Sequence, residues 1–209
     1  MVAEEKVEME GLIEGAAKLR GHLCVGIPLG VRMGLQGLAL LGMDDKESRE
    51  NLMVVAETNS CSVDGIQVST GCSAGGRKLR VYEYGRSAAV FYDGITGKGF
   101  RVSTRPEFDA QALALAVKDG IVSEGQEVEE GSKLDRKIMM NAFLRMPIEE
   151  LLECRPVKIT AKSLLRQGRN HVRSVCSQCG EVIMDGRGIT RNDQVFCYPC
   201  FYGAYYTVA

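Results

Sequence analysis

Hydrophobic positions in the first third of the chain follow two different periods. Over residues 7–19 they recur every three or four positions, which predicts one face of an α-helix. A second helix is predicted over residues 27–41, where Pro28 suits the first turn and Gly42 the end. The centre of residues 51–58 is continuously apolar, and so short a run predicts a buried strand.

Three glycines recur every four residues in and just before the second predicted helix, at Gly26, Gly30 and Gly34. Glycine weakens a helix, so its repetition on one face needs another explanation. We expect the backbone of another element to approach this face closely.

The rest of the pattern predicts shorter elements separated by glycine-containing turns. Strands at 79–82, 88–92 and 99–102 are predicted to form an antiparallel meander. The other predicted elements are helices at 61–70, 108–118 and 134–146, a loop at the acidic residues 124–130, a short helix opened by Pro147 and ended by Pro156, and a last strand at 157–160. This order predicts an α+β core domain over residues 1–160 with a mixed or antiparallel sheet, a linker at 161–173 and a terminal module at 174–209.

Composition and charge narrow the class of protein. The 209 residues are 45% hydrophobic and 25% charged, with a net charge of −1, so a packed core is expected and bulk charge points to neither nucleic acid nor membrane. The N-terminus lacks the pattern of a signal peptide, so we expect a cytoplasmic location and reduced cysteines. Eight reduced cysteines then indicate metal binding or catalysis.

The last four cysteines predict a structural zinc site. Two Cys-x-x-Cys pairs, Cys176 with Cys179 and Cys197 with Cys200, are separated by 17 residues. Zn²⁺ prefers four thiolates in a tetrahedron, and four protein ligands leave no open position for catalysis. The order of turns and a closing helix resembles a treble-clef finger, with one zinc per chain.

The segment before the finger is basic. Residues 154–180 contain no acidic residue and six cations: Arg155, Lys158, Lys162, Arg166, Arg169 and Arg173. Such a linker could contact nucleic acid or an acidic partner, or it could be a solvated connector. The acidic balance of the remaining chain makes nucleic acid the less expected partner.

A second group of chemical residues lies near the N-terminus. His22 and Cys24 face the same side if the segment is extended, and Cys24 precedes a predicted helix whose N-terminus favours a thiolate. The other members of this group are Glu57, Cys61, Asp64, Gln67 and Cys72. The set suits a metal site with an open position, or a reactive thiol oriented by a base; alternatively, the cysteines are small buried apolar residues.

These motifs resemble the FmdE family, named for a component of formylmethanofuran dehydrogenase. The matching segments are Gly21-His22-Leu23-Cys24 with Gly26, the stretch from Glu57 to Cys61 with Asp64 and Gln67, Gly71-Cys72, residues 147–152 and the two terminal cysteine pairs. The resemblance implies a dimerising α+β core with a cleft lined by histidine and cysteine, and an auxiliary treble-clef finger.

The resemblance also implies a role. We expect an accessory or ligand-binding subunit associated with a molybdenum or tungsten enzyme of one-carbon metabolism, as in methanogenesis. In that role Cys24 is the reactive thiol or ligand, His22 tunes or co-ligates, Cys61 and Cys72 complete the pocket, and Asp64 and Gln67 bind the ligand.

Two departures from the family pattern affect this site. The family motif begins with a histidine where this chain has Arg20, and has a proline where this chain has Val25. A cation at Arg20 makes a second, divalent metal in the cleft less expected and an anionic ligand more expected. Two rivals stay open: a thiol- or metal-dependent enzyme using Cys24 and His22, and a regulator that binds through the linker and finger.

Overall fold

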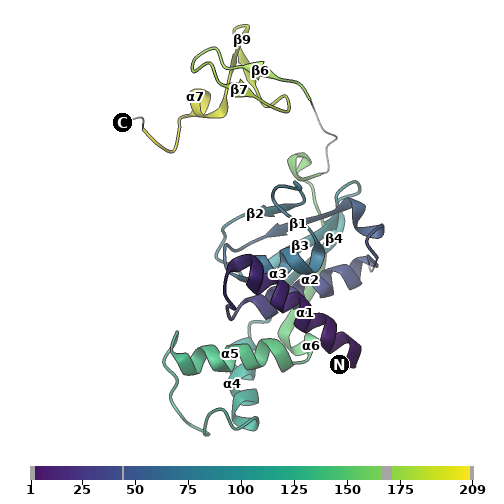
Figure 1. Ribbon diagram of the computed structural model, residues 1–209, viewed down its shortest axis with the longest axis vertical. Helices are drawn as coiled ribbons and strands as arrows, with labels where there is room; N and C mark the ends of the chain where they lie inside the picture. Colours follow the sequence, from purple (N-terminus) through teal and green to yellow (C-terminus); the bar gives the residue numbers. More distant parts are fainter. Residues whose placement is uncertain (1–2, 44, 166–170, 208–209) are drawn as a thin grey trace. The chain divides into compact units, whose positions relative to one another are not determined.

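A computed structural model describes residues 3–43, 45–165 and 171–207 (Figure 1). The chain divides into two compact units, Met1–Arg166 and Gln167–Ala209. Five residues of the predicted linker, 166–170, lie outside the described residues. In the part of the chain that the structure describes, no helix is both long and apolar enough to span a membrane.

The first unit is built on one five-stranded sheet. Its strands are β1 (Leu52–Ala56), β2 (Leu79–Val81), β3 (Ala88–Asp93), β4 (Lys98–Thr104) and β5 (Leu152–Lys158), in the order β2-β1-β3-β4-β5. β3 pairs antiparallel with β1 and β4, and β5 pairs antiparallel with β4. β2 pairs parallel with β1, so the sheet is mixed.

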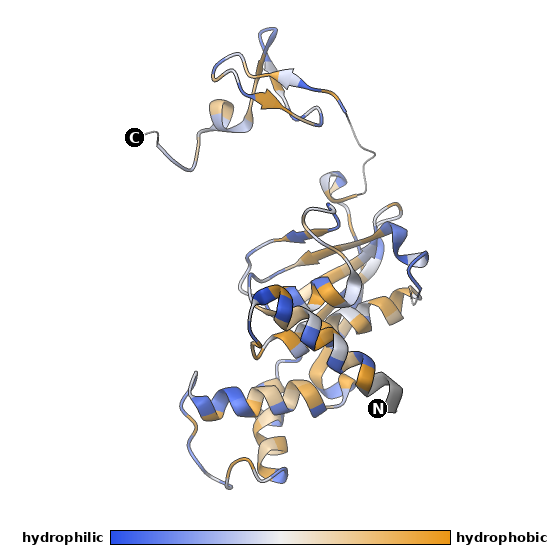
Figure 2. Ribbon diagram, viewed as in Figure 1, coloured by the Kyte–Doolittle hydropathy of each residue, from blue (hydrophilic) through white to orange (hydrophobic). Residues whose placement is uncertain are grey.

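Six α-helices accompany this sheet in the described part of the unit. They are α1 (Ala3–Arg20), α2 (Ile27–Leu41), α3 (Ser62–Thr70), α4 (Phe108–Lys118), α5 (Lys133–Arg145) and α6 (Ile148–Leu151), with short 3₁₀ turns at Ser48–Asn51 and Lys162–Leu164. Figure 2 shows much of α2 in hydrophobic colours and the start of α5 in hydrophilic ones. The predicted α+β class, with helices on a mixed sheet, is confirmed.

Two details of the sequence prediction are wrong. The strand at residues 79–82 does not join a meander; Leu79 and Val81 pair in parallel with Val54 and Ala56. The reason is that α3 carries the chain across the sheet, which is the connection that parallel neighbours need. Pro156 does not end a helix but lies within β5, where an edge strand tolerates a residue without a backbone N–H.

β1 is buried on both faces, which explains its continuous apolar sequence. Leu52 and Val54 belong to the larger core cluster, together with residues of α2, α4 and α5. Met53 and Val55 point to the other face, where Leu164 covers them. Burying one such side chain stabilises the fold by about 1.5–3 kcal/mol, so both faces hold this strand at the centre of the unit.

α2 and α3 pack backbone against backbone, as the glycine repeat predicts. A Cβ atom on Gly30 would collide with the carbonyl oxygen of Ser62 at the start of α3. In the same way, a Cβ on Gly65 of α3 would collide with the carbonyl oxygen of Ile27 in α2. The contact brings the first turns of the two helices together.

The second unit is small. Its elements are β6 (Ser174–Val175), β7 (Val182–Ile183), β8 (Ile189–Arg191), β9 (Gln194–Phe196) and α7 (Tyr198–Tyr202). β6 pairs with β7 and β8 with β9, both antiparallel. Gly180 has a φ of 74°, which suits the tight turn after the first cysteine pair. This succession is compatible with the predicted treble-clef finger.

Candidate functional site

Two cysteine thiols meet where α2 and α3 begin. Cys24 lies in the loop before α2, and Cys61 is the N-cap residue of α3. Their sulfur atoms are 2.7 Å apart and share a hydrogen bond, although 37 positions separate them in sequence. Both residues are partly exposed, so reagents in solution can reach the pair.

Gly26 makes this meeting possible. A Cβ atom on Gly26 would lie 2.8 Å from Cys61 Sγ, so a larger residue would displace the Cys61 thiol from its place beside Cys24. The backbone N–H of Gly26 also acts to lower the pKa of both thiols. The N-terminal ends of two helices, of 15 and 9 residues, therefore converge on the two thiols.

A cation completes the surroundings of the pair. Arg20 Nη1 lies 2.8 Å from Asp64 Oδ2, and its positive charge acts on both thiols. Burial raises the pKa of the Cys24 thiol, but hydrogen bonds from Cys61 and Gly26 and the charge of Arg20 outweigh it, and the pKa lies below its ordinary value. Burial and the neighbouring Cys24 raise the pKa of Cys61. Cys24 is therefore the thiol that ionises first.

The spacing of this pair does not match two ligands of one zinc ion. Two thiolates bound to a tetrahedral zinc at about 2.3 Å lie about 3.8 Å apart. Cys24 Sγ and Cys61 Sγ are 2.7 Å apart. The carboxylate of Asp64, three positions after Cys61, is already paired with Arg20. The donor set suits thiol chemistry better than a second metal site.

Two other predicted site residues lie close by in sequence without joining the thiols. His22 is exposed in the turn between α1 and α2, and no hydrogen bond connects its ring with Cys24 in the described structure. Gln67 is half-buried on α3, three positions beyond Asp64. The i, i+3 spacing keeps it on the same side of the helix as Asp64.

Glu57 has partners that the sequence analysis did not identify. Glu57 is 7% exposed, and its carboxylate accepts two hydrogen bonds from Arg101 on β4, at 2.9 and 2.8 Å, while Arg86 Nη1 lies 3.7 Å away. These bonds hold the pKa of Glu57 below its ordinary value, although burial opposes them. A carboxylate so engaged ties β1 to β4 and is not a free base. The available signal in the sequence was its position directly after the apolar run 52–56, since a charge at the end of a buried strand needs an opposite partner.

Cys72 lies apart from the thiol pair, after the last turn of α3. A nine-residue helix is about 14 Å long, so Cys72 and Cys61 lie at opposite ends of it. The Cys72 thiol is buried 3.8 Å from the carbonyl oxygen of Leu52, and burial raises its pKa. The residues predicted to line one cleft therefore lie at two separate places: Cys24 and Cys61 at the start of α3, and Cys72 beyond its end.

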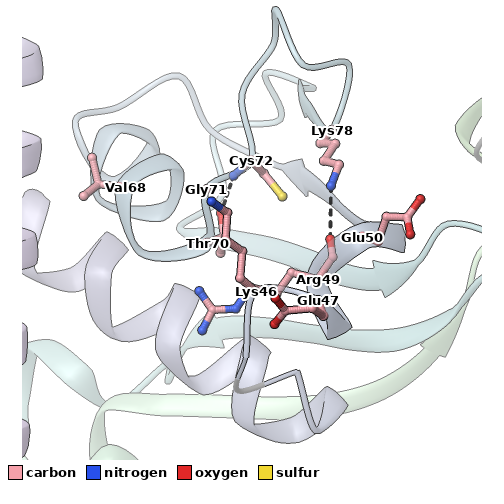
Figure 3. A pocket seen from close by; sticks show the side chains of 9 residues that line it. All are labelled: Lys46, Glu47, Arg49, Glu50, Val68, Thr70, Gly71, Cys72 and Lys78. Carbon is pink, nitrogen blue, oxygen red and sulfur yellow. Dashed lines mark hydrogen bonds between the residues drawn. The ribbon is translucent and has the colours of Figure 1, made fainter.

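A pocket of about 720 Å³ opens beside Cys72 (Figure 3). Within it, the Lys78 ammonium donates to the carbonyl oxygen of Arg49 at 3.1 Å. The nine lining residues carry both charge signs: Lys46, Glu47, Arg49, Glu50, Val68, Thr70, Gly71, Cys72 and Lys78. The basic and acidic lining residues escaped the sequence analysis because they lie in turns with no recognisable motif.

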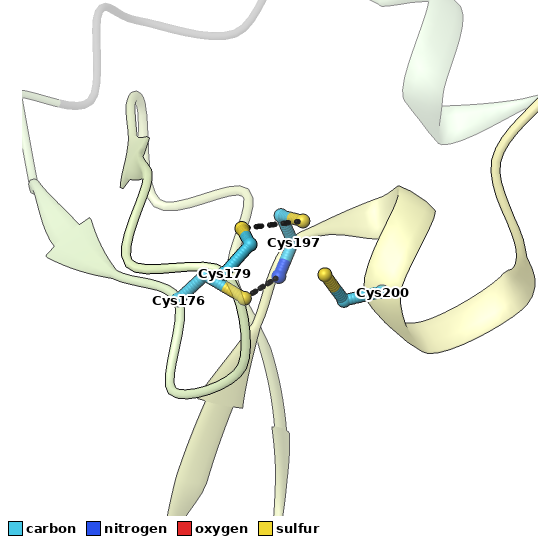
Figure 4. A group of neighbouring side chains, drawn as sticks. All are labelled: Cys176, Cys179, Cys197 and Cys200. Atoms are coloured by element: carbon cyan, nitrogen blue, oxygen red, sulfur yellow. Dashed lines mark hydrogen bonds between the residues drawn. The ribbon is translucent and has the colours of Figure 1, made fainter. Parts of the chain in front are cut away.

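The terminal cysteines gather as their spacing predicts (Figure 4). The sulfur atoms of Cys176, Cys179, Cys197 and Cys200 all lie within 4.8 Å of one another. Cys179 Sγ and Cys197 Sγ are 3.8 Å apart, which equals the separation of about 3.8 Å expected for two thiolates on zinc. The four residues therefore fit a tetrahedral metal ion such as zinc.

Shifted pKa values within this cluster favour binding of a cation. Backbone N–H groups of Cys179 and Cys197 lower the pKa of Cys176 to about 6, and the N–H of Cys197 lies 3.3 Å from its sulfur. The hydrogen bond with Cys197 contributes most to raising the pKa of Cys200 to about 12. Without a cation, the negative charge of one thiolate disfavours ionisation of the neighbouring thiols. A bound metal ion neutralises that charge and so favours the ionised form of all four.

Solved structures include one with the same overall fold. A crystal structure of a tungsten formylmethanofuran dehydrogenase FmdE-like protein from Syntrophus aciditrophicus superposes with a TM-score of 0.63. The match covers 95% of each chain at 23% sequence identity, a level at which the comparison shows the fold alone.

A curated relative from Archaeoglobus fulgidus is described as a probable S-adenosyl-L-methionine-binding protein. It is 28% identical over 216 aligned positions, which include 99% of this chain. The chain spans 56% of that relative, about half of its length.

A family model covers most of the first unit. The model is described as FmdE, molybdenum formylmethanofuran dehydrogenase operon, and it matches residues 19–153. The matched range contains the whole sheet core up to the start of β5 and both thiols of the pair. The sequence motifs, the fold and this match agree, and the chain belongs to the FmdE family.

Proposed function

We propose that this chain is a ligand-binding accessory subunit for a formylmethanofuran dehydrogenase of the molybdenum or tungsten type, and that the Cys24 thiolate is its working group. Family membership supports the association with that enzyme and its one-carbon chemistry. The observation that carries the assignment of the site is the meeting of Cys24 and Cys61 at two helix N-termini beside Arg20.

In this function each site residue has a distinct task. Cys24 engages the ligand as a thiolate, since two helix N-termini and Arg20 stabilise its negative charge. Arg20 attracts an anionic group, Asp64 holds Arg20 in place, and Gln67 offers an amide to the ligand. His22 is exposed two positions before Cys24, where it can hydrogen-bond to the bound ligand.

The reactivity of Cys24 is the direct test of this site. Alkylation by iodoacetamide, followed by peptide mass spectrometry from about pH 5 to 9, should label Cys24 faster than Cys154 near neutral pH. Cys154 is the matched control because it is partly buried on β5 and burial raises its pKa. Equal alkylation rates at Cys24 and Cys154 would refute the proposal that Cys24 is a reactive thiolate.

The association with the enzyme has its own test. The chain is mixed with purified formylmethanofuran dehydrogenase, and complex formation is followed by sedimentation velocity. A co-sedimenting complex supports the accessory role. Separate sedimentation at micromolar concentrations of both proteins contradicts it. The same experiment on the chain alone gives the mass of the homodimer that we propose for it.

Zinc is the metal proposed for the finger, at one ion per chain. Elemental analysis of protein purified without oxygen is the measurement. One zinc per chain supports a metal confined to the terminal cysteines; a second metal per chain would assign an ion to the core and contradict the thiol site proposed here.

A second candidate function concerns the finger itself. The rings of Tyr198 and Tyr202 on α7 are exposed, with their centroids 4.7 Å apart. Exposed aromatic rings together with basic residues are typical of surfaces that bind single-stranded nucleic acid, and residues 154–180 of this chain carry six cations and no acidic residue. This hypothesis predicts salt-sensitive binding of an oligonucleotide by the full chain, lost in a double Tyr198→Ala, Tyr202→Ala variant. No binding at low salt would exclude it.

The pocket beside Cys72 does not favour the binding named for the Archaeoglobus relative. Adenine bases are usually held by aromatic or aliphatic side chains. Of the nine residues that line this pocket, none is aromatic and Val68 is the sole aliphatic one. A calorimetric titration with S-adenosylmethionine, repeated with the Cys72→Ser variant, is the check, and we expect no binding in this pocket.

A further inference from the structure

We propose that Cys24 and Cys61 form a reversible dithiol–disulfide couple, in which Cys24 attacks an external disulfide and Cys61 resolves the product. The proposal deepens the thiol function above and rests on it. The external reactant is a low-molecular-weight disulfide, such as oxidised glutathione or an analogous cellular disulfide.

The separation of the sulfur atoms is the first reason. A disulfide bond is about 2.05 Å long, and two sulfurs in ordinary contact lie much further apart than the 2.7 Å found here. Cys24 Sγ and Cys61 Sγ therefore need only a small approach to bond. The loop position of Cys24 and the cap position of Cys61 allow this approach without moving a strand.

The different surroundings of the two sulfurs assign their roles. Cys24 Sγ shares its hydrogen bond with Cys61 Sγ, and the backbone N–H groups of Gly26 and Val25 lower the pKa of Cys24. The lower pKa that results agrees with its role as the attacking thiolate. Cys61 keeps its proton longer and lies in position to attack the Cys24 sulfur once that sulfur is part of a mixed disulfide.

The exchange balances in two steps. The Cys24 thiolate attacks one sulfur of the external disulfide, so that a mixed disulfide forms and one thiolate leaves. Cys61 then loses its proton and attacks Cys24 Sγ, so that the Cys24–Cys61 bond forms and the second thiolate leaves. Two electrons pass from the dithiol to the external disulfide, and the two protons end on the released thiols. The reverse reaction, with two external thiols, restores the dithiol.

Other cysteines do not compete for these roles. Cys72 lies at the far end of α3 and is buried, and Cys154 lies on β5. The four terminal cysteines are proposed to be held by zinc. The couple is therefore expected to be specific to one pair out of eight cysteines.

The experiment uses the full zinc-loaded chain, reduced and then exposed to oxidised glutathione without oxygen. Samples are quenched with acid, alkylated and digested with trypsin. Cleavage places Cys24 in the peptide 21–32 and Cys61 in the peptide 50–77, so the couple appears as a link between these two peptides. Fragmentation of the longer peptide separates Cys61 from Cys72.

Three variants define the roles. Cys61→Ser should raise the glutathione mixed disulfide on Cys24 by about tenfold or more over the unmodified chain, because the intramolecular resolving step is lost. Cys24→Ser should form neither the link nor a mixed disulfide on Cys61. Cys154→Ser is the matched control and should behave as the unmodified chain does. Far-UV circular dichroism of each variant verifies the fold.

The outcomes separate this proposal from the one on which it rests. Fast alkylation of Cys24 with a mixed disulfide that persists in the unmodified chain overturns the couple and leaves the working thiolate standing. Slow alkylation of Cys24 overturns both. A link from Cys24 to Cys72, or protection of both thiols by a copurified metal ion, also overturns the couple.

Discussion

Replacing Gly30 by alanine tests whether the contact between α2 and α3 holds the thiol pair together. The added Cβ would collide with the carbonyl oxygen of Ser62, which follows Cys61 directly in the chain. The colliding atoms belong to the backbone, so no side-chain rotation can relieve the contact. The first turn of α3 must move away from α2.

Two opposing effects determine the size of the change. Alanine favours a helix over glycine by about 1 kcal/mol. Overpacking in a close contact costs about 1–3 kcal/mol, and collision with backbone places this case at the upper end. We therefore expect Gly30→Ala to lower the free energy of unfolding by about 1–2 kcal/mol.

Gly11 provides the matched control. It lies within α1, and nothing lies within 4 Å of the Cβ that alanine would add there. Gly11→Ala should therefore raise the free energy of unfolding by about 0.5–1 kcal/mol, since helix propensity acts alone.

Urea unfolding followed by far-UV circular dichroism is the assay. With a slope of about 2 kcal/mol per molar urea, Gly30→Ala should lower the midpoint by roughly 0.5–1 M. The Cys24–Cys61 link should also form more slowly, because the sulfur atoms are further apart. A Gly30→Ala protein as stable as the Gly11→Ala protein would refute the reasoning.

Three further predictions concern charge and metal. Glu57→Gln should be less stable than the unmodified chain at pH 7, and the difference should shrink as the pH falls below 4.5, the ordinary pKa of this carboxyl group, because Arg101 lowers that pKa in the folded state. A constant difference in urea midpoints from about pH 7 to pH 3 would contradict it. Arg20→Gln should slow alkylation of Cys24 at pH 7 by roughly two- to tenfold, since a cation that stabilises the thiolate is lost; an unchanged pH–rate profile would remove Arg20 from the site. Cys176→Ser should lower bound zinc to well below one per chain and unfold the finger, with the first unit intact by circular dichroism. Full zinc retention in that variant would contradict the four-cysteine site.

Much of the fold could be predicted because its signals are local. Residues 27–41 have helical periodicity with a proline at the start and a glycine at the end, and the helix occupies those positions. Residues 52–56 are uniformly apolar because β1 is buried on both faces. The four terminal cysteines could be predicted as a cluster because the Cys-x-x-Cys spacing brings the sulfurs of each pair together, in a turn for the first pair and at the start of α7 for the second.

The tertiary structure alone decided which distant residues meet. Cys24 reaches Cys61 across 37 positions because glycines let α2 and α3 touch. Glu57 reaches Arg101 across 44 positions because β3 places β1 and β4 on its two sides. The strand after α3 joins β1 in parallel, and Cys72 is carried to the far end of the helix. Sequence spacing determines which face of an element a side chain occupies, whereas the distance between elements depends on how their surfaces pack, and that is where the thiol pair originates.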